Sequence, residues 1–170
     1  CAALFEGYGE LPDSPDVMVR QGRVFGVKSP VSDGLIADMA VLWARSEGGE
    51  GRLYLLKLND PGVKRERLEP IDGSQNVAAL HFDGAPVQPL GDDGRSAVEV
   101  LMARAAILQA AEQVGAASRC LAFVAEHVKE RQAFGGPIGR MQAIKHKLAD
   151  RYTDNELSRS HLYHGLWALD

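Results

Sequence analysis

Proline and glycine are concentrated in the first part of this 170-residue chain. Seven of the eight prolines and thirteen of the eighteen glycines precede residue 95. Both residue types are common in turns between strands and unfavourable inside helices. The distribution predicts an α+β fold in two parts that meet near Gly94, with strands over residues 1–94 and helices over residues 95–170.

The first part has the pattern of short strands separated by turns. Turn residues at 46–49, 59–62 and 72–74 separate apolar runs at a spacing of roughly ten residues. This spacing is typical of an antiparallel β-barrel or sandwich. The pattern alone suits a plain β-module without a site of its own equally well. The predicted strands cover residues 1–6, 17–21, 23–32, 39–45, 52–57, 64–68 and 77–82.

Apolar residues repeat every seven positions in the second part. This repeat predicts one helix over residues 96–131, about 50 Å long at ~1.5 Å per residue. Such a helix is longer than a globule of this size needs, so we expect other helices or another subunit to cover it. The repeat consists of Val100, Ile107, Val114, Leu121 and Val128, with Ala103, Ala110, Ala117 and Val124 between them.

A second helix is predicted from about Arg140, after a glycine- and proline-containing break at residues 132–139. The predicted helix is still continuing at Asp170, without the glycine, proline or cap that usually ends a helix. We therefore expect the chain to be a segment of a longer protein. The apolar stripe of this helix comprises Ile144, Leu148, Tyr152, Tyr163 and Trp167.

The charge balance excludes some classes of partner. The chain carries 19 basic and 23 acidic residues, a net charge of −4. Residues 1–95 hold 10 basic and 15 acidic groups (10 − 15 = −5), and residues 96–170 hold 9 and 8 (9 − 8 = +1). A net acidic chain argues against nucleic acid as the main partner.

No apolar run approaches the roughly 20 residues of a membrane span. Cys1 and Cys120 lack metal-site spacing, and two cysteines favour a reducing, intracellular setting.

Hydrolytic and metal-binding motifs are absent from the sequence. It contains no GxSxG, HExxH, CxxC or P-loop. His161 and His164 are three residues apart on a predicted helix, but without a third ligand we interpret them as surface residues rather than a metal site. We expect Cys120 to be a small buried apolar residue on the first helix. The sequence thus predicts no metal site and no catalytic residue in this segment.

The break between the predicted helices, with the start of the second helix (residues 131–142, hereafter the interhelical corner), carries three groups suited to a nucleotide cofactor. Arg131 can pair with a diphosphate, Phe134 can pack on a ring, and Gln142 can hydrogen-bond the edge of a heterocycle. The alternative is a helix–loop–helix corner with an exposed arginine and a core phenylalanine. The residues alone leave both interpretations open.

The same residues carry a resemblance to a known family. Arg131-x-x-Phe134-Gly135-x-Pro137-Ile138, with Gln142 and Leu148-Ala149-Asp150, resembles a characteristic stretch of the acyl-CoA dehydrogenases. Residues 26–38 are similar to the family's GxKxWITNGxxAD strand and turn, and residues 3–6 to the start of its ALTEPxAGSD motif. The resemblance covers essentially the whole chain in order. It identifies residues 1–94 as the middle β-domain, and residues 95–170 as the start of the C-terminal helical bundle.

The resemblance implies a flavoprotein that oxidises an acyl-CoA thioester to the 2-enoyl-CoA with FAD, located in the cytoplasm or, in a eukaryote, the mitochondrial matrix. It implies that the long helices form a four-helix bundle and a homo- or hetero-oligomer (dimer or tetramer), and that an electron-transfer acceptor reoxidises the flavin. Leu4, Phe5, Val31 and Ser32 would lie beside the flavin ring. Arg131, Phe134 and Gln142 would reach the FAD of a neighbouring subunit, and Arg104 would approach the substrate.

The chain also departs from the family pattern. Phe5 replaces a hydroxyl residue, residues 7–12 replace PxAGSD, Pro30 stands where the family has Trp or Phe, and Ala103 leaves one family position for a catalytic Glu empty. The other position would lie beyond Asp170, so this segment would hold no general base. A second hypothesis is therefore a non-catalytic structural subunit of a hetero-oligomer. A third is a β-module with a helical hairpin for protein contacts.

Overall fold

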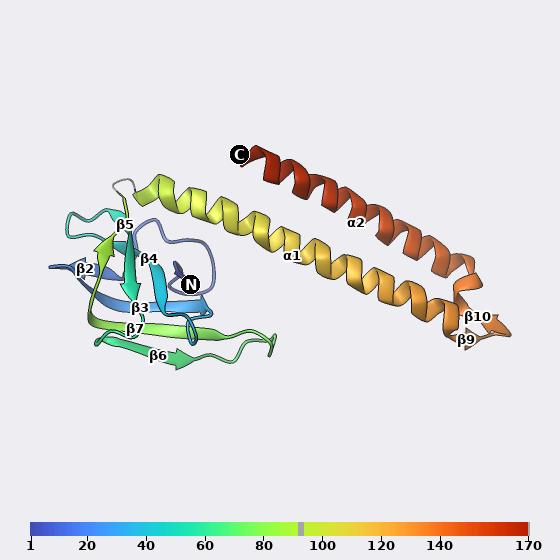
Figure 1. Ribbon diagram of the computed structural model, residues 1–170, viewed down its shortest axis with the longest axis horizontal. Helices are drawn as coiled ribbons and strands as arrows, with labels where there is room; N and C mark the ends of the chain where they lie inside the picture. Colours follow the sequence, from blue (N-terminus) through green and yellow to red (C-terminus); the bar gives the residue numbers. More distant parts are fainter. Residues whose placement is uncertain (92–93, 170) are drawn as a thin grey trace. The chain divides into compact units, whose positions relative to one another are not determined.

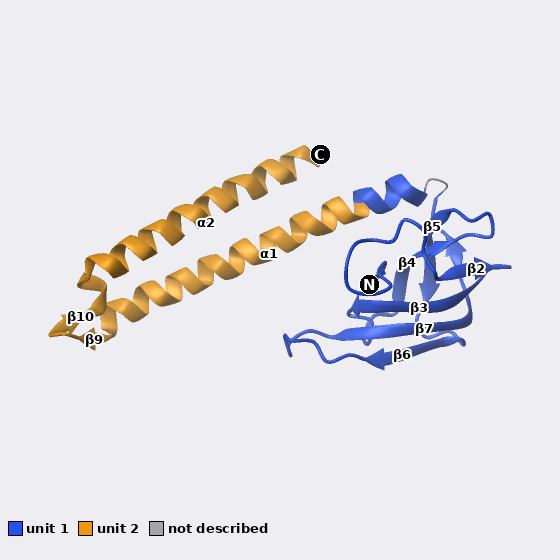
Figure 2. Ribbon diagram, turned by 180° about the vertical axis from the view of Figure 1, so that it is seen from behind, with its two compact units in different colours: residues 1–100 blue, residues 101–170 orange. Residues whose placement is uncertain are grey.

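The computed structural model describes residues 1–91 and 94–169, which form two compact units over residues 1–100 and 101–170 (Figure 2). Helix α1 (Gly94–Glu130) begins in the first unit and continues through the second. Val98 in its first turns is completely buried, and this anchors the beginning of α1 to the first unit. The two units divide between Val100 and Leu101, within α1.

The first unit is built on an eight-stranded sheet (Figure 1). The strands follow the order β6-β7-β3-β2-β4-β5-β8, and β1 pairs with β4. Every predicted strand segment contains an observed strand, and the α+β class is confirmed. The strands are β1 (Ala2–Ala3), β2 (Met18–Arg20), β3 (Arg23–Ser32), β4 (Met39–Arg45), β5 (Gly51–Lys57), β6 (Val63–Arg67), β7 (Val77–Pro86) and β8 (Gln88–Pro89).

The sheet differs in two respects from the predicted antiparallel barrel or sandwich. Across the described residues its pairing path is open, ending at β6 and β8, and does not close into a barrel. β4 pairs in parallel with both β1 and β2, whereas the other pairs are antiparallel. Parallel pairing needs a connection that crosses over, and strand patterns along the sequence do not reveal one.

One face of the sheet forms the core. Alternate residues of β3, β4, β5 and β7 point to this face, as the two-residue period of a strand requires. Its fully buried members include Val24, Val31, Leu42, Ala78 and Leu80. Trp43 points to the opposite face and is also buried, and its indole Nε1 donates to the carbonyl of Pro12 at 2.9 Å. The loop before β2 thus covers part of the outer face.

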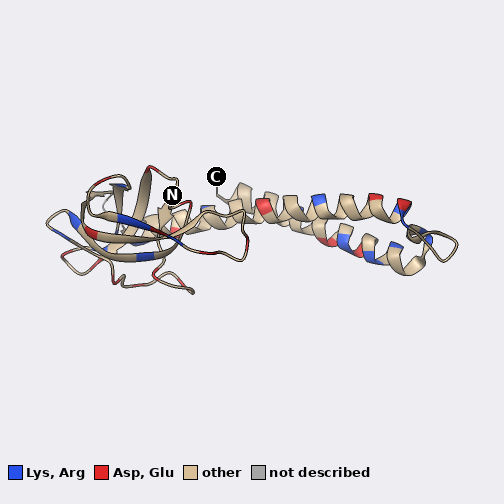
Figure 3. Cartoon of the chain, turned by 90° about the horizontal axis from the view of Figure 1, so that it is seen from below, with Lys and Arg blue, Asp and Glu red and all other residues tan. Residues whose placement is uncertain are grey.

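The second unit is a helical hairpin, as predicted (Figure 1). α1 runs to Glu130, and a short two-stranded hairpin of β9 (Gln132–Ala133) and β10 (Gly136–Pro137) follows it. A 3₁₀ turn, η1 (Ile138–Arg140), leads into α2 (Gln142–Ala168). Both signs of charge occur along the two helices (Figure 3). None of the described helices combines the length and apolar character needed to cross a membrane.

The predicted apolar repeat of α1 is only partly covered. Ile107, Val114 and Leu121 are half-buried and Val128 is buried, whereas Val100 and Val124 are exposed. The centre of the hairpin is polar: the Ser118 hydroxyl accepts hydrogen bonds from Asn155 Nδ2 at 2.8 Å and from Arg159 Nη2 at 2.9 Å. The repeat therefore extends beyond the face that α2 covers.

Cys120 was expected to be buried, and this prediction was wrong: the residue is exposed. The half-buried positions around it are Ser118 and Leu121, so Cys120 lies outside the strip that α2 covers. The spacing of apolar residues indicated an amphipathic helix but did not indicate how wide its covered face is.

The first turn of α1 provides a test of this packing. A Cβ atom at Gly94 would lie 2.4 Å from the Gly51 carbonyl oxygen and 2.7 Å from Arg52 Cα, both backbone atoms that cannot move aside. We expect Gly94→Ala to lower the free energy of unfolding by about 1–3 kcal/mol in urea denaturation. Gly115→Ala on the same helix is the control, because nothing lies within 4 Å of its Cβ position. It should raise stability by about 0.5–1 kcal/mol through helix propensity, and equal effects of the two substitutions would contradict the packing.

Candidate functional site

A buried ion pair joins the amino-terminal segment to the middle of β3. Lys28 is completely buried, and its Nζ lies 2.8 Å from Glu6 Oε1 and 2.9 Å from the carbonyl oxygen of Leu4. The Ser29 amide donates to the carbonyl of Phe5 at 3.0 Å. The segment that contains Leu4 and Phe5 therefore lies alongside β3, although 22 residues separate Glu6 from Lys28.

The Glu6 carboxylate also organises the start of β2. It accepts the amides of Asp16 at 2.7 Å and Val17 at 2.9 Å. Burial raises the pKa of Glu6, but the hydrogen bonds from Lys28, Asp16 and Val17 outweigh burial, and the pKa lies below its ordinary value. Burial lowers the pKa of Lys28, and its hydrogen bond to Glu6 opposes that effect. The sequence resemblance contained both residues, but their pairing was not predicted.

The structure brings the four residues predicted beside a flavin into one region of the first unit. Leu4 and Val31 are buried in the core, at 4% and 0% exposure, and their carbonyl oxygens accept hydrogen bonds from Lys28 Nζ and from the Gly34 amide. Phe5 is half-buried and Ser32 is exposed, and both side chains remain accessible. The pairing of β3 with β7 shifts register between Lys28 and Val31, just before Ser32 pairs with Val77. Such an irregularity changes the direction in which side chains at the end of a strand point.

Arg65 holds the turn that follows these residues. Its Nη1 donates to the carbonyl oxygens of Leu35 at 3.1 Å and Ala37 at 2.9 Å, and its Nη2 donates to Asn59 Oδ1 at 2.6 Å. The Asp33 amide donates to the carbonyl of Asn76. Arg65 was not predicted from the sequence, because an arginine on a highly charged edge strand is usually solvent-exposed without a structural role. Its contacts indicate a supporting role for the end of β3.

The interhelical corner presents its three predicted groups to the surface of the second unit. Arg131 and Gln142 are exposed, and Phe134 is 85% exposed at φ 53°. Arg140 stabilises the hairpin, because its guanidinium donates to the carbonyls of Phe134 and Gly135. Phe134 is thus held on the surface rather than buried as a core residue. Sequence reasoning did not single out Arg140.

The remaining predicted residues lie on the long helices. Arg104 and the neighbouring Ala103 are exposed on α1. His161 and His164 are exposed on α2, where the His164 ring lies 5.7 Å from that of Trp167. Over the described residues, no group of three potential ligands could hold a metal ion. These positions offer isolated polar groups rather than a preorganised centre.

Comparisons with known proteins show that the chain is similar to acyl-CoA dehydrogenases. Residues 92–170 match the family model described as "Acyl-CoA dehydrogenase, C-terminal domain". The chain is 32% identical to the acyl-CoA dehydrogenase IpdE2 of Mycobacterium tuberculosis over 176 residues, which cover 89% of this chain and 55% of that protein. The chain thus spans about half the length of the curated relatives it matches.

Solved structures extend the likeness over nearly the whole chain. The structure of the Tcur3481-Tcur3483 steroid ACAD G363A variant superposes with a TM-score of 0.84 at 30% identity, covering 98% of this chain and 46% of that one. The ChsE4-ChsE5 complex from Mycobacterium tuberculosis gives a TM-score of 0.81 at 28% identity, covering 97% and 45%. Both units, in the same order, therefore have counterparts in these proteins.

The ion pair makes a prediction about stability. Lys28→Met removes the positive charge that pairs with the Glu6 carboxylate, whose side chain is 12% exposed. We expect it to lower the free energy of unfolding by about 3–5 kcal/mol, because an unpaired buried charge remains. Lys129→Met is the control, since that lysine pairs with Glu126 on the surface, and it should leave the urea midpoint unchanged. A Lys28→Met protein as stable as the parent would contradict this account.

The lowered pKa of Glu6 predicts a pH dependence. Because Glu6 remains ionised in the folded protein at a pH where the unfolded chain binds a proton, it stabilises the fold above its ordinary pKa of 4.5. That contribution disappears as the pH falls through the lowered pKa of the folded state. Glu6→Gln should therefore flatten the loss of unfolding free energy below about pH 5. An unchanged slope would show that Glu6 is not the group responsible.

Proposed function

Because the chain is a segment of the acyl-CoA dehydrogenase family, we propose that its protein is an FAD-dependent oxidoreductase that converts an acyl-CoA thioester into the 2-enoyl-CoA. The observation that carries the proposal is the likeness, over 98% of the chain and at 30% identity, to a steroid ACAD. We assign residues 1–94 to the middle β-domain and residues 95–170 to the start of the C-terminal bundle. The match of residues 92–170 to the C-terminal family model supports this division.

The interhelical corner fits the cofactor chemically. An exposed aromatic ring held by Arg140, beside an exposed arginine and an exposed amide, suits a dinucleotide with a diphosphate and flat rings. Among the described residues 94–169, the Arg131 guanidinium has no hydrogen-bond or ion-pair partner. We propose that Arg131 binds the pyrophosphate of FAD and that Phe134 and Gln142 contact its rings. FAD, when bound, accepts the hydride from the substrate.

In the first unit, we propose that Phe5 and Ser32, whose side chains are accessible, contact the flavin. We propose that the buried residues Leu4 and Val31 lie behind them and fix their positions. Glu6 cannot act as the base that removes the α-proton, because Lys28 and two amides occupy its carboxylate and lower its pKa. We therefore expect the base to come from outside residues 1–170.

Apolar side chains on the second unit support an oligomer. Residues of this size are unusual in clusters on a free surface. We propose that other helices of the protein or of a neighbouring subunit cover them. The exposed group comprises Leu108, Phe123, Tyr152, Leu157, Tyr163 and Trp167.

A second candidate function is a non-catalytic subunit of a hetero-oligomer. Phe5 lacks the hydroxyl of the family motif, so its side chain cannot offer a hydrogen bond to a flavin. The likeness to a complex of two proteins, ChsE4-ChsE5, makes a paired assembly a concrete alternative. In that assembly the partner would provide the base.

The test uses the purified full-length protein. We expect flavin absorbance that is bleached by an acyl-CoA, and we expect Arg131→Gln to raise the dissociation constant of FAD roughly tenfold or more, because a charged hydrogen bond is lost. Arg119→Gln, an exposed arginine on α1, is the matched control and should bind FAD normally.

Other outcomes separate the two candidate functions. Flavin and activity that appear only after co-expression with a paralogous subunit would favour the hetero-oligomer. A protein that binds no FAD, alone or with such a partner, would refute both proposals.

A further inference from the structure

A basic groove lies on the outer face of the sheet, near the hairpin between β2 and β3. Val19 and Val24 are buried on the core face, so the residues on either side of them point to the opposite face. Met18 there pairs with Phe25 on β3 and with Arg45 on β4. These three side chains form a row across three strands, and the groove that they line has a volume of about 960 Å³.

The groove carries an excess of positive charge. Arg20 and Arg23 are directly opposite each other on β2 and β3, and Arg45 lies beside Met18. Like charges in directly opposed positions destabilise a sheet. The acidic residue in the lining, Glu47, accepts the Gln21 amide. The groove is therefore lined by three guanidinium groups and one carboxylate. This excess of positive charge lies within residues 1–95, whose net charge is −5 (10 − 15).

Two of these arginines are free to bind a ligand. Arg23 Nη1 donates to the carbonyl of Gly84 at 2.7 Å, which fixes that guanidinium at the rim. In the part of the chain that the structure describes, the side chains of Arg20 and Arg45 have neither a hydrogen bond nor an ion pair. Unpaired guanidinium groups above a partly apolar floor are suited to phosphate oxygens attached to a ring.

We propose that this groove binds a nucleotide phosphate. Arg20 and Arg45 bind the phosphate oxygens, and Phe25 and Met18 pack against the base. A single small anion would leave most of a groove of this volume unfilled, whereas a nucleotide supplies both several negative charges and a flat apolar surface. The ligand has two possible sources, the nucleotide end of CoA or a free adenine nucleotide.

The course of β3 favours the CoA source. Phe25, Val27 and Ser29 alternate along this strand with the buried Val24 and Lys28, so their side chains lie on its outer face. Val27 is 43% exposed, so this face remains open between the groove and the proposed flavin-facing residues. From Phe25 to Ser32 the strand covers roughly 23 Å at about 3.3 Å per residue. An extended thioester could therefore reach both places, an inference that rests on the proposed function.

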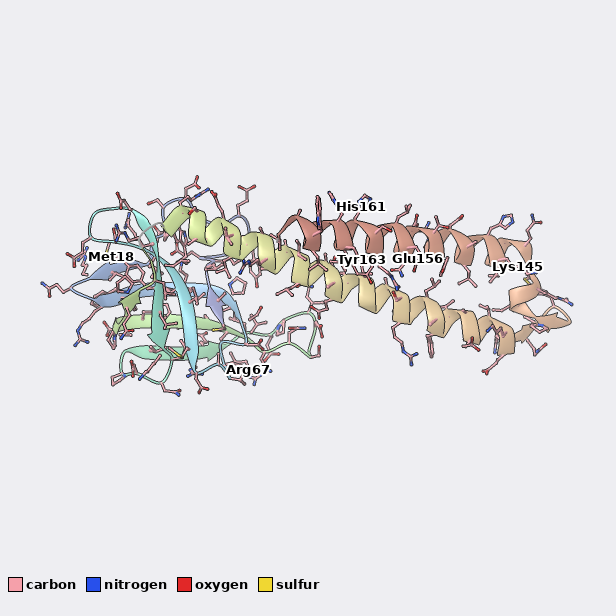
Figure 4. All side chains as sticks on the ribbon, turned by 45° about the horizontal axis from the view of Figure 1, so that its top comes forward. Met18, Arg67, Lys145, Glu156, His161 and Tyr163 are labelled. Carbon is pink, nitrogen blue, oxygen red and sulfur yellow. The ribbon has the colours of Figure 1, made fainter. Side chains whose placement is uncertain are left out.

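The experiment is calorimetric titration of the full-length protein with adenosine 3′,5′-bisphosphate, ADP, adenosine and inorganic pyrophosphate. We expect the two nucleotides to bind, with affinity that falls as salt rises, and adenosine not to bind. Arg20→Gln and Arg45→Gln should each weaken nucleotide binding at least tenfold. Arg67→Gln is the matched control, because Arg67 is an exposed arginine on β6, elsewhere on the sheet (Figure 4), and should change the affinity less than twofold.

Several results would overturn the proposal. These are no nucleotide binding, binding that Arg20→Gln and Arg45→Gln leave intact while the circular dichroism spectrum is unchanged, or pyrophosphate binding as tightly as the nucleotides. If Arg20→Gln raises KM for acyl-CoA without changing kcat, the nucleotide belongs to CoA. If ADP binds without competing with acyl-CoA, the groove takes a free nucleotide. Arginine-dependent nucleotide binding in a protein that binds no FAD would refute the proposed function while supporting the groove.

Discussion

The buried pair of Glu6 and Lys28 is the interaction on which the first unit depends. One carboxylate joins the amino-terminal segment, the middle of β3 and the start of β2 through a lysine and two amides. A charge buried this deeply is tolerated only when it is paired and hydrogen-bonded. The pair thus holds Leu4 and Phe5 against β3.

The proposed site has two parts, one in the first unit beside buried residues and one on the exposed surface of the second unit. In the first unit, the buried Leu4 and Val31 are neighbours in sequence of the accessible Phe5 and Ser32, and Arg65 supports the turn beyond Ser32. In the second unit, a short hairpin held by Arg140 displays Phe134 and Arg131 on the surface. Neither set includes a proton acceptor for the chemistry. In the proposed function, residues 1–170 would therefore hold and orient a cofactor, and the base would come from outside them; the chain spans about half the length of the relatives it matches.

Secondary structure was largely predictable because it follows local patterns. Turn residues separated the strands, and the seven-residue repeat outlined α1. Local patterns did not reveal that β4 pairs in parallel with β1 and β2, or that the sheet remains open. The exposure of Cys120 was wrongly predicted for a related reason. The period of a helix identifies an apolar face but does not show how much of it a neighbour covers.

The sequence by itself determined where strands give way to helices and where the helices turn. These features depend on residues close together in the chain, so proline, glycine and apolar spacing were sufficient. Only the tertiary structure decided that Glu6 pairs with Lys28, that Leu4 and Val31 are buried, and that Arg20, Arg23 and Arg45 share one groove. Each of these depends on strand register, which joins residues far apart in sequence and sets the face to which each side chain points.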